Sequence, residues 1–317
     1  MSNKQPEVYF YVPYADVLQV REDEEKYTYA NGIVSRRKFL KSPLNYIGGK
    51  YKLLPQLIEF FPEKINTFVD LFSGGFNVGI NVDCNKVVCN DMNTFIIDLY
   101  KELYSKPIDE TLNKITGRIN EYGLSKENEE AFKKFRNYYN KTKEPIDLYT
   151  LSCYSFNYQF RFNNNKEYNN PFGRNRSQFS DNMKSNLILF TEKLKSMNVE
   201  FLSEPFDKVD LSKLNSEDFV YCDPPYLITT GSYNDGNRGF KDWKEEEEIQ
   251  LYKVLDELNK RKVKFALSNV IEHKGKENIL LKEWSKKYKT IYLTSDYSNS
   301  SYNTKRDKSI EVLIINY

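Results

Sequence analysis

The stretch DFVYCDPPY, Asp218–Tyr226, constrains the fold more than any other part of the chain. Its first half is a short apolar run, which is typical of a buried β-strand. Two prolines then end that strand, because each lacks an N–H donor and holds φ at about −65°. Asp223 is therefore expected to project from the carboxyl end of a buried strand, directly before Pro224, Pro225 and Tyr226.

Strand and helix patterns alternate around this stretch. An apolar strand is predicted at Thr67–Phe72, broken by Gly74 and Gly75, and a second strand at Lys86–Asn90. An amphipathic helix follows, and three more strands are predicted after residue 263. Repeated strand–helix units are the building blocks of an open parallel sheet, so the sequence predicts an α/β fold.

The pattern changes between residues 105 and 180. A charged helical segment is followed there by a run in which aromatic, asparagine and arginine residues interleave without a core-like period. We therefore predict an N-terminal arm over residues 1–40, one α/β domain formed by residues 41–104 and 181–317, and an inserted, mainly helical domain over residues 105–180.

Composition narrows the classes of function. The chain has 317 residues, 39% of them hydrophobic, which predicts a globular fold, and its net charge of +2 means that any nucleic-acid surface must come from local clusters. No signal peptide or membrane-spanning run is evident, so we expect a cytoplasmic protein without membrane contact. The four cysteines show no paired spacing, and the one histidine, His273, is expected in a surface loop. We therefore expect no metal site and no histidine base.

Two acids point to a cofactor that contains a ribose. Asp70 is predicted at the end of the first strand, and Gly74 would let the backbone approach a ligand closely. Asp91 ends the next strand about 20 residues later, where a ribose-binding acid is expected. No basic residue in this glycine loop could hold a pyrophosphate, so a nucleoside cofactor without phosphates fits better than NAD. The alternative is that the glycines form only a tight turn.

The strand-end motif is suited to an amino group. Ligands of open α/β sheets bind outside the carboxyl ends of the strands, where Asp70, Asp91 and Asp223 are expected to gather. The Asp223 carboxylate and the Pro224 carbonyl could accept both hydrogens of an exocyclic amine, while Tyr226 offers a face for a base to stack on. The alternative is an ordinary turn with an exposed acid.

These residues carry a resemblance to a known family. From about Ser42 to Tyr317 the chain resembles the Dam-type, alpha-class adenine-N6 DNA methyltransferases, through LNYIGGKYKLL, DLFSGG, NDMN, YCDPPY, ALSN and EVLIINY in that order. The resemblance implies a Rossmann-like sheet with an antiparallel C-terminal strand, and S-adenosylmethionine as methyl donor. It implies catalysis by Asp223, Pro224, Pro225 and Tyr226, and cofactor contacts from Tyr46, Lys50, Asp70, Phe72, Gly74, Asp91, Phe206 and Asp223. Tyr46 stands where the family usually has tryptophan.

The resemblance also implies that the insert reads double-stranded DNA through a β-hairpin and that the target adenine is flipped out of the duplex. The matching DNA-contact residues are Phe156, Asn157, Gln159, Arg161, Pro171 and Arg174. Phosphate contacts are expected from Lys38, Lys41, Lys52, Arg174, Arg176, Lys305 and Arg306. Gln159 replaces a family leucine, and glutamine pairs with adenine, so a target other than GATC is also open. A merely solvated polar hairpin is the alternative.

The predicted function is therefore site-specific DNA adenine-N6 methylation, with a restriction endonuclease as functional partner. Methylation of cytosine N4, of RNA or of a protein glutamine remains open, although protein-glutamine enzymes usually carry asparagine before the two prolines. A non-catalytic, sequence-specific DNA-binding protein is a further alternative, for which intact DPPY and NDMN motifs are not expected.

Overall fold

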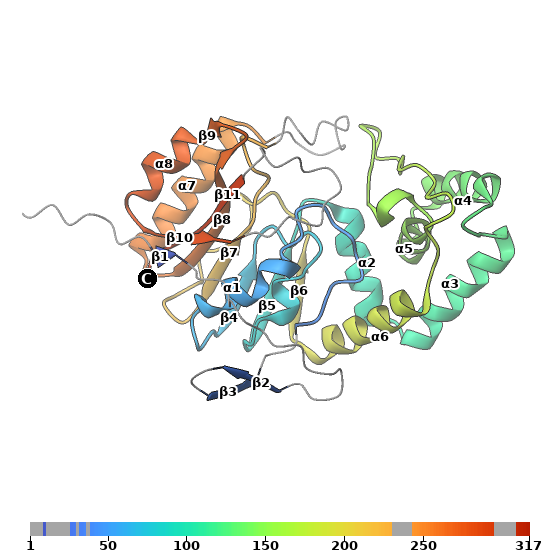
Figure 1. The fold of residues 1–317 in the computed structure, drawn as a ribbon, viewed down its shortest axis with the longest axis horizontal. Coiled ribbons are helices and arrows are strands. Elements are labelled where there is room, and N and C mark those ends of the chain that lie inside the picture. The colour runs from blue at the N-terminus through green and yellow to red at the C-terminus, as the bar shows by residue number, and fades with distance from the viewer. Residues whose placement is uncertain (1–8, 11–25, 30–31, 36–38, 230–242, 295–308) are drawn as a thin grey trace, which may run out of the picture.

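A computed structural model describes residues 9–10, 26–29, 32–35, 39–229, 243–294 and 309–317. The chain forms one large mixed sheet with helices on both faces and a group of helices at one end (Figure 1). Within the described residues no helix is long and apolar enough to cross a membrane.

The large sheet has the strand order β1-β10-β11-β8-β7-β4-β5-β6, and β9 pairs with β8 at the side. All pairs from β8 through β6 are parallel, whereas β11 runs antiparallel to both of its neighbours. The expectation of a mostly parallel sheet with an antiparallel C-terminal strand is confirmed. The strands are β1 (Tyr9–Phe10), β4 (Thr67–Asp70), β5 (Lys86–Asn90), β6 (Val199–Leu202), β7 (Phe219–Cys222), β8 (Lys264–His273), β9 (Lys276–Glu277), β10 (Lys289–Leu293) and β11 (Ser309–Ile315).

Helices cover both faces of this sheet. Along β7, Phe219 and Tyr221 belong to one buried cluster, whereas Val220 and Cys222 belong to the other. Apolar residues on both faces are typical of parallel strands covered on two sides. The first cluster includes residues of α1 (Leu54–Glu59), α2 (Thr94–Ser105) and α6 (Asp181–Ser196). The second includes residues of α7 (Glu245–Lys260) and α8 (Ile279–Ser285).

The strand order reverses between β4 and β7. The chain passes from β4 to β5 and β6 on one side and then returns to β7 on the other side of β4. Asp70 pairs with Tyr221, and the Leu71 N–H donates to the Tyr221 carbonyl at 3.0 Å. The carboxyl ends of β4 and β7 are therefore neighbours at a topological switch point, where open α/β sheets bind their ligands.

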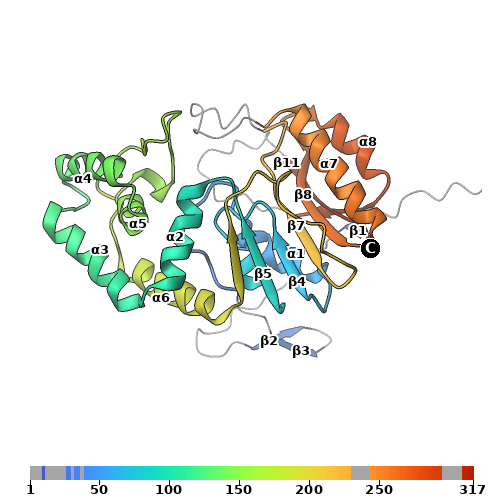
Figure 2. The same cartoon turned by 180° about the vertical axis from the view of Figure 1, so that it is seen from behind.

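A group of helices lies at the end of the molecule remote from β8, β10 and β11, in both views of the chain (Figures 1 and 2). It comprises α3 (Ile108–Tyr122), α4 (Glu129–Thr142) and α5 (Pro145–Cys153). Buried residues of these helices, among them Ile115 and Phe135, belong to the same apolar cluster as the first face of the sheet. The predicted insert, residues 105–180, thus begins at the end of α2 and stops where α6 starts, but it shares a core with the sheet.

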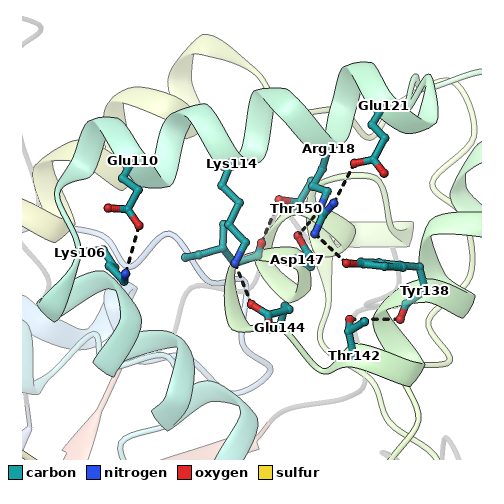
Figure 3. Close-up of polar contacts among 11 residues, drawn as sticks. Lys106, Glu110, Lys114, Arg118, Glu121, Tyr138, Thr142, Glu144, Asp147 and Thr150 are labelled. Atoms are coloured by element: carbon teal, nitrogen blue, oxygen red, sulfur yellow. Dashed lines mark hydrogen bonds and ion pairs between the residues drawn. The ribbon is translucent and has the colours of Figure 1, made fainter.

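Arg118 joins these helices from within. Its Nε lies 3.0 Å from Oδ1 of Asp147, one terminal nitrogen lies 2.8 Å from Glu121 and the other donates to the Tyr138 hydroxyl at 2.8 Å (Figure 3). The Asp147 side chain is fully buried. One cation therefore contacts side chains from α3, α4 and α5, which fixes the relative positions of the three helices.

One local expectation needs correction. His273, expected in a surface loop, is the last residue of β8, and its Nδ1 lies 2.6 Å from the Ser309 hydroxyl. In the N-terminal arm, Tyr9–Phe10 pairs in parallel with β10 and so extends the edge of the sheet. The arm also contains an antiparallel pair, β2 (Lys26–Tyr29) and β3 (Gly32–Ser35). These two elements and the residues from 39 onward are the described parts of that arm.

Candidate active site

Asp223 is fixed between two donors. It follows β7 directly, and its Oδ2 lies 2.9 Å from Nζ of Lys50, while the Tyr226 hydroxyl donates to Oδ1 at 2.9 Å. Burial raises the pKa of Asp223, and the ammonium of Lys50 and the bond from Tyr226 oppose that rise. The two prolines fix the backbone between the acid and the tyrosine. This carboxylate therefore has a defined orientation before any ligand binds.

Lys50 connects the early part of the chain with this motif. Its side chain is only 6% exposed, and Nζ also donates to the Gly48 carbonyl at 2.8 Å. The same ammonium lies 5.0 Å from the centroid of the Tyr226 ring, within cation–π range. The resemblance implied a cofactor contact for Lys50, and the ion pair with Asp223 was not predicted from the sequence.

Asp91 accepts two backbone hydrogen bonds. Oδ2 accepts from the Gly74 N–H at 2.9 Å, and Oδ1 accepts from the Asn93 N–H at 2.8 Å. Burial raises the pKa of Asp91 to about 6, although both hydrogen bonds act to lower it. Because a carboxylate has about four lone-pair sites, each oxygen keeps capacity to accept a ribose hydroxyl.

The glycine turn packs closely against an aromatic ring. Gly74 has φ +45°, and a Cβ there would lie 3.0 Å from Cδ1 of Tyr46. The Gly74 carbonyl accepts a hydrogen bond from the Tyr100 hydroxyl at 2.7 Å. The turn thus needs glycine for its backbone conformation and for space, and Tyr46 covers it.

Asp70 is the most enclosed acid at this edge. It is 1% exposed, and Oδ2 accepts from the Gly79 N–H at 3.1 Å. Oδ1 is buried without a hydrogen-bond partner within the described part of the chain. Burial raises its pKa well above the ordinary value, and the charges of Asp223 and Asp91 add to that rise. The three acids predicted to gather at the carboxyl edge are thus close enough to interact electrically.

Three aromatic rings pack against one another near the carboxyl ends of β4 and β6. Phe72 and Phe206 are 5.5 Å apart between ring centroids, so the structure brings these two predicted residues together. Trp243 contacts both, with centroid distances of 5.6 Å to Phe72 and 5.5 Å to Phe206. The sequence analysis missed Trp243. The signal available was a lone tryptophan directly before the acidic start of a helix.

The predicted DNA-contacting turn lies against the segment that contains Asn45 and Tyr46. Asn157 and Tyr158 both adopt left-handed backbone angles, with φ of 53° and 56°. Asn45, next to Tyr46, donates to the Asn157 carbonyl at 2.6 Å and bridges to Gln159. Buried Asn170 donates to the carbonyls of Phe156 and Gln159 at 2.9 and 3.0 Å. Neither asparagine was predicted from the sequence: Asn45 lies in LNYIGGKYKLL, where only cofactor contacts were expected, and the polar residues around Asn170 were assigned to DNA.

The remaining predicted DNA contacts are spread over the same folded-back segment, which bridges antiparallel at Ser155–Phe172 and Phe162–Tyr168. Phe156 and Pro171 are exposed, and Arg174 is exposed and paired with Glu129. Arg161 is half-buried, and its Nε has no hydrogen-bond partner in the described residues. Of the predicted phosphate contacts, Lys41, Lys52 and Arg176 are exposed, while Lys38, Lys305 and Arg306 lie outside the described residues.

Comparison with known proteins decides the family. The family of D12 class N6 adenine-specific DNA methyltransferases matches residues 46–299, most of the chain. The chain belongs to this family. Its membership agrees with the Dam-type resemblance, because the DNA adenine methylase of Escherichia coli is 27% identical over 285 residues, covering 88% of this chain and 95% of that protein.

Two longer relatives are more similar. Type II methyltransferase M.FokI of Planomicrobium okeanokoites is 62% identical over 279 residues, which cover 88% of this chain and 43% of that protein. Modification methylase StsI of Streptococcus sanguinis is 55% identical over 287 residues, covering 90% of this chain and 44% of that protein. The chain therefore spans less than half the length of these two members of the family.

No group of histidine, cysteine and acidic side chains that could hold a metal ion occurs in the part of the chain that the structure describes. The cysteines at 89, 153 and 222 are buried free thiols, and Cys84 is partly buried.

Proposed function

We propose that this chain is a site-specific DNA adenine-N6 methyltransferase that uses S-adenosylmethionine and acts on double-stranded DNA. One observation carries the proposal. An oriented carboxylate, Asp223, lies in a DPPY motif at the same sheet edge as the Asp91–Gly74 turn, in a chain that belongs to an adenine-specific DNA methyltransferase family.

The residues present fit the cofactor. Asp91 supplies carboxylate oxygens for ribose hydroxyls, and Gly74 allows close approach of the backbone. The buried Oδ1 of Asp70 is free to accept from an amino group. Phe72 and Phe206 supply aromatic surface for an adenine ring. The loop at residues 71–79 contains no lysine or arginine that could bind a phosphate. This composition is expected for a loop that binds a nucleoside without phosphates.

When bound, S-adenosylmethionine supplies an electrophilic methyl group on sulfur. The chain's own residues hold and activate the acceptor. The target adenine is extruded from the duplex at a cost of roughly a few kcal/mol, and the Tyr226 ring is the surface on which it stacks. The Asp223 carboxylate and the Pro224 carbonyl accept the two N6 hydrogens, which frees the nitrogen lone pair.

The ion pair with Lys50 has a second role in this scheme. A buried carboxylate tends to be neutralised, and Lys50 favours the ionised form that can accept hydrogen bonds. Methylation replaces one N6 hydrogen, so one proton must leave the nitrogen. The raised pKa of Asp223 makes its carboxylate a better acceptor for that proton than an exposed aspartate.

We also propose that residues 105–180 form the DNA-reading domain. Exposed Phe156 and the left-handed turn at Asn157 are suited to entering the gap left by the flipped base. Gln159 and Arg161 are candidates for reading adenine and guanine in the major groove. Arg161 is half-buried, which limits the freedom of its side chain before DNA binds.

The longer relatives suggest a biological setting. One is named a type II methyltransferase and another a modification methylase. We propose that this chain protects DNA against a restriction endonuclease with the same target, as a functional rather than a physical partner.

The test is transfer of labelled methyl from S-adenosylmethionine to duplex DNA of mixed sequence, followed by hydrolysis to nucleosides and identification of the labelled base. Label in N6-methyladenine alone supports the proposal. Label in N4-methylcytosine would establish cytosine as the target, and DNA binding without any label would establish a non-catalytic binding protein. Long-read sequencing of DNA from a host that expresses the chain would then identify the target sequence.

A further inference from the structure

A buried carboxylate lies behind the aromatic rings of the candidate cofactor site. Glu248, on α7, is fully buried and accepts from the Trp243 indole N–H and the Tyr252 hydroxyl, each at 2.6 Å. Its Oε1 also accepts from the side chains of Asn269 at 3.0 Å and Asn278 at 3.2 Å. All four donors are neutral, and a buried anion needs such bonds to replace its lost hydration. Glu248 therefore holds each donor in a defined orientation.

Trp243 is the donor that reaches the site. It is only 9% exposed, and it contacts Phe72 edge-on while lying tilted against Phe206. Phe72 lies in the loop after β4, and Phe206 lies in the loop after β6. These loops leave strands on either side of β5, so one buried indole spans the carboxyl edge behind both phenylalanines.

We propose that Trp243, oriented by Glu248, is a positioning residue that sets the spacing of Phe72 and Phe206 for the adenine ring of the cofactor. The inference rests on the proposed function, which gives Phe72 and Phe206 a cofactor to bind. The half-buried phenylalanines present the open surface, while Trp243 supports them from the protein side. A pre-formed aromatic surface loses less freedom when the ligand binds, so its effect falls on cofactor affinity.

The chain contains a matched control. The second tryptophan of the sequence, Trp284, also donates its indole N–H to an aspartate, Asp256, at 2.9 Å. It stacks on Tyr252 with a centroid distance of 4.3 Å and lies in the same apolar cluster as Trp243. Its ring contacts are Tyr252, Phe265 and Tyr288, none of which lies at the carboxyl edge. Its acceptor, Asp256, is 30% exposed and lies outside the cofactor site. Because Tyr252 also donates to Glu248, Trp284→Phe keeps an aromatic ring against Tyr252, and Asp256→Asn alters the tryptophan–carboxylate hydrogen bond alone.

The experiment compares Trp243→Ala, Trp243→Phe and Glu248→Gln with Trp284→Phe and Asp256→Asn. Steady-state kinetics give KM for S-adenosylmethionine, KM for DNA and kcat, and calorimetry gives the Kd of S-adenosylhomocysteine. We expect Trp243→Ala to raise KM and Kd for the cofactor about tenfold, a change equivalent to about 1.4 kcal/mol. Trp243→Phe should recover part of that loss, and Glu248→Gln should raise cofactor KM by about threefold. The two control variants should leave cofactor KM unchanged.

Fluorescence supplies a readout that does not depend on the alanine variant folding. In Trp284→Phe, Trp243 is the sole tryptophan, and S-adenosylhomocysteine should change its emission. In Trp243→Phe the same ligand should leave the emission of Trp284 unchanged. Unaltered Trp243 emission, or an equal rise of cofactor KM in the Trp284 and Trp243 series, would overturn the inference. If the wild-type chain transfers no methyl group, the proposed function fails instead, which keeps the two outcomes distinct.

Discussion

Two largely buried acid–base pairs in the described part of the chain can be compared, Asp223 with Lys50 at the sheet edge and Asp147 with Arg118 among the helices. Both ion-pair distances are short, at 2.9 and 3.0 Å, and burial raises the pKa of both aspartates against the pull of the partner cation. The pairs differ in what surrounds them. Asp147 is fully enclosed by helices, whereas the Asp223 side chain remains 17% exposed at the carboxyl end of β7.

This difference shows what a perturbed acid can and cannot indicate. A raised pKa marks burial in both regions, so it does not by itself distinguish a catalytic acid from a structural one. Position distinguishes them. Asp223 lies at the topological switch point of the sheet and is followed directly by two prolines. Asp147 lies among the helices, where its carboxylate pairs with Arg118 (Figure 3).

The largest expected effect on turnover concerns the Asp223–Lys50 pair. Replacing Asp223 with alanine removes the acceptor of the N6 hydrogens, and we expect kcat to fall by about a hundredfold or more. Rapid-quench measurement of methyl transfer to duplex DNA checks this value. Circular dichroism and urea denaturation of the variant serve as the controls for a folded chain. Near-normal turnover would rule out the mechanism.

For the Asp147–Arg118 pair, we expect a mutation to lower stability and not turnover. Asp147→Ala leaves Arg118 partly buried without its main partner, which should lower the free energy of unfolding by about 3–5 kcal/mol. Urea denaturation followed by circular dichroism measures the free energy of unfolding. A double variant with Arg118→Met and Asp147→Leu should lose less, because no charge is left unpaired. A fall in kcat per folded molecule as large as that of Asp223→Ala would break the distinction between the two pairs.

Asp91 offers a prediction with opposite signs for binding and stability. Its pKa is raised to about 6, above the ordinary value of about 3.9, so its contribution to stability is present at low pH and lost as pH rises through about 6. Cofactor affinity should change the other way, because ribose hydroxyls need the ionised acceptor. Calorimetry with S-adenosylhomocysteine between about pH 5 and about pH 7 should show tightening by roughly tenfold.

Asp91→Asn is the control for that pH series, since Asp70 and Asp223 also have raised pKa values. Subtracting the pH profile of this variant from that of the wild type isolates the titration of Asp91. Identical pH profiles for the variant and the wild type would remove Asp91 from cofactor binding.

The last prediction concerns reading of the DNA and leaves turnover on the best sequence almost unchanged. Gln159→Leu removes an amide that can pair with adenine, and we expect loss of about 1–3 kcal/mol of discrimination at one base pair with little change in kcat on the best sequence. Methylation of a duplex library, read by sequencing, measures the preference. Lys52→Ala provides the contrast, because losing a phosphate contact should weaken binding to all sequences alike. An unchanged preference for Gln159→Leu would assign this residue to the turn and not to the DNA.

Much of the fold follows from local pattern. Apolar runs at β4, β5 and β7 and the helical spacing of α2 predict the alternating units, because both depend on residues near one another in the chain. The predicted strand at Thr67–Phe72 ends earlier, at Asp70, since the residues after it form the turn that carries Gly74. His273 was misplaced because pairing with β11 extends β8 beyond its apolar run.

The sequence by itself determined the chemistry at this edge. Asp223 before two prolines, Asp91 about 20 residues after Asp70, and glycines between them specify which groups leave the ends of which strands. Those signals are local, and covalent geometry enforces them.

Only the tertiary structure decided which groups share the site. The contacts of Lys50 with Asp223, of Asn45 with Asn157 and of Trp243 with Phe206 join residues far apart in the chain. No periodicity or spacing encodes such contacts, because they depend on how the sheet closes and which loops then meet at its edge. The pair of Arg118 and Asp147 was likewise not identified from the sequence, because nothing local to either residue marks a contact between two different helices.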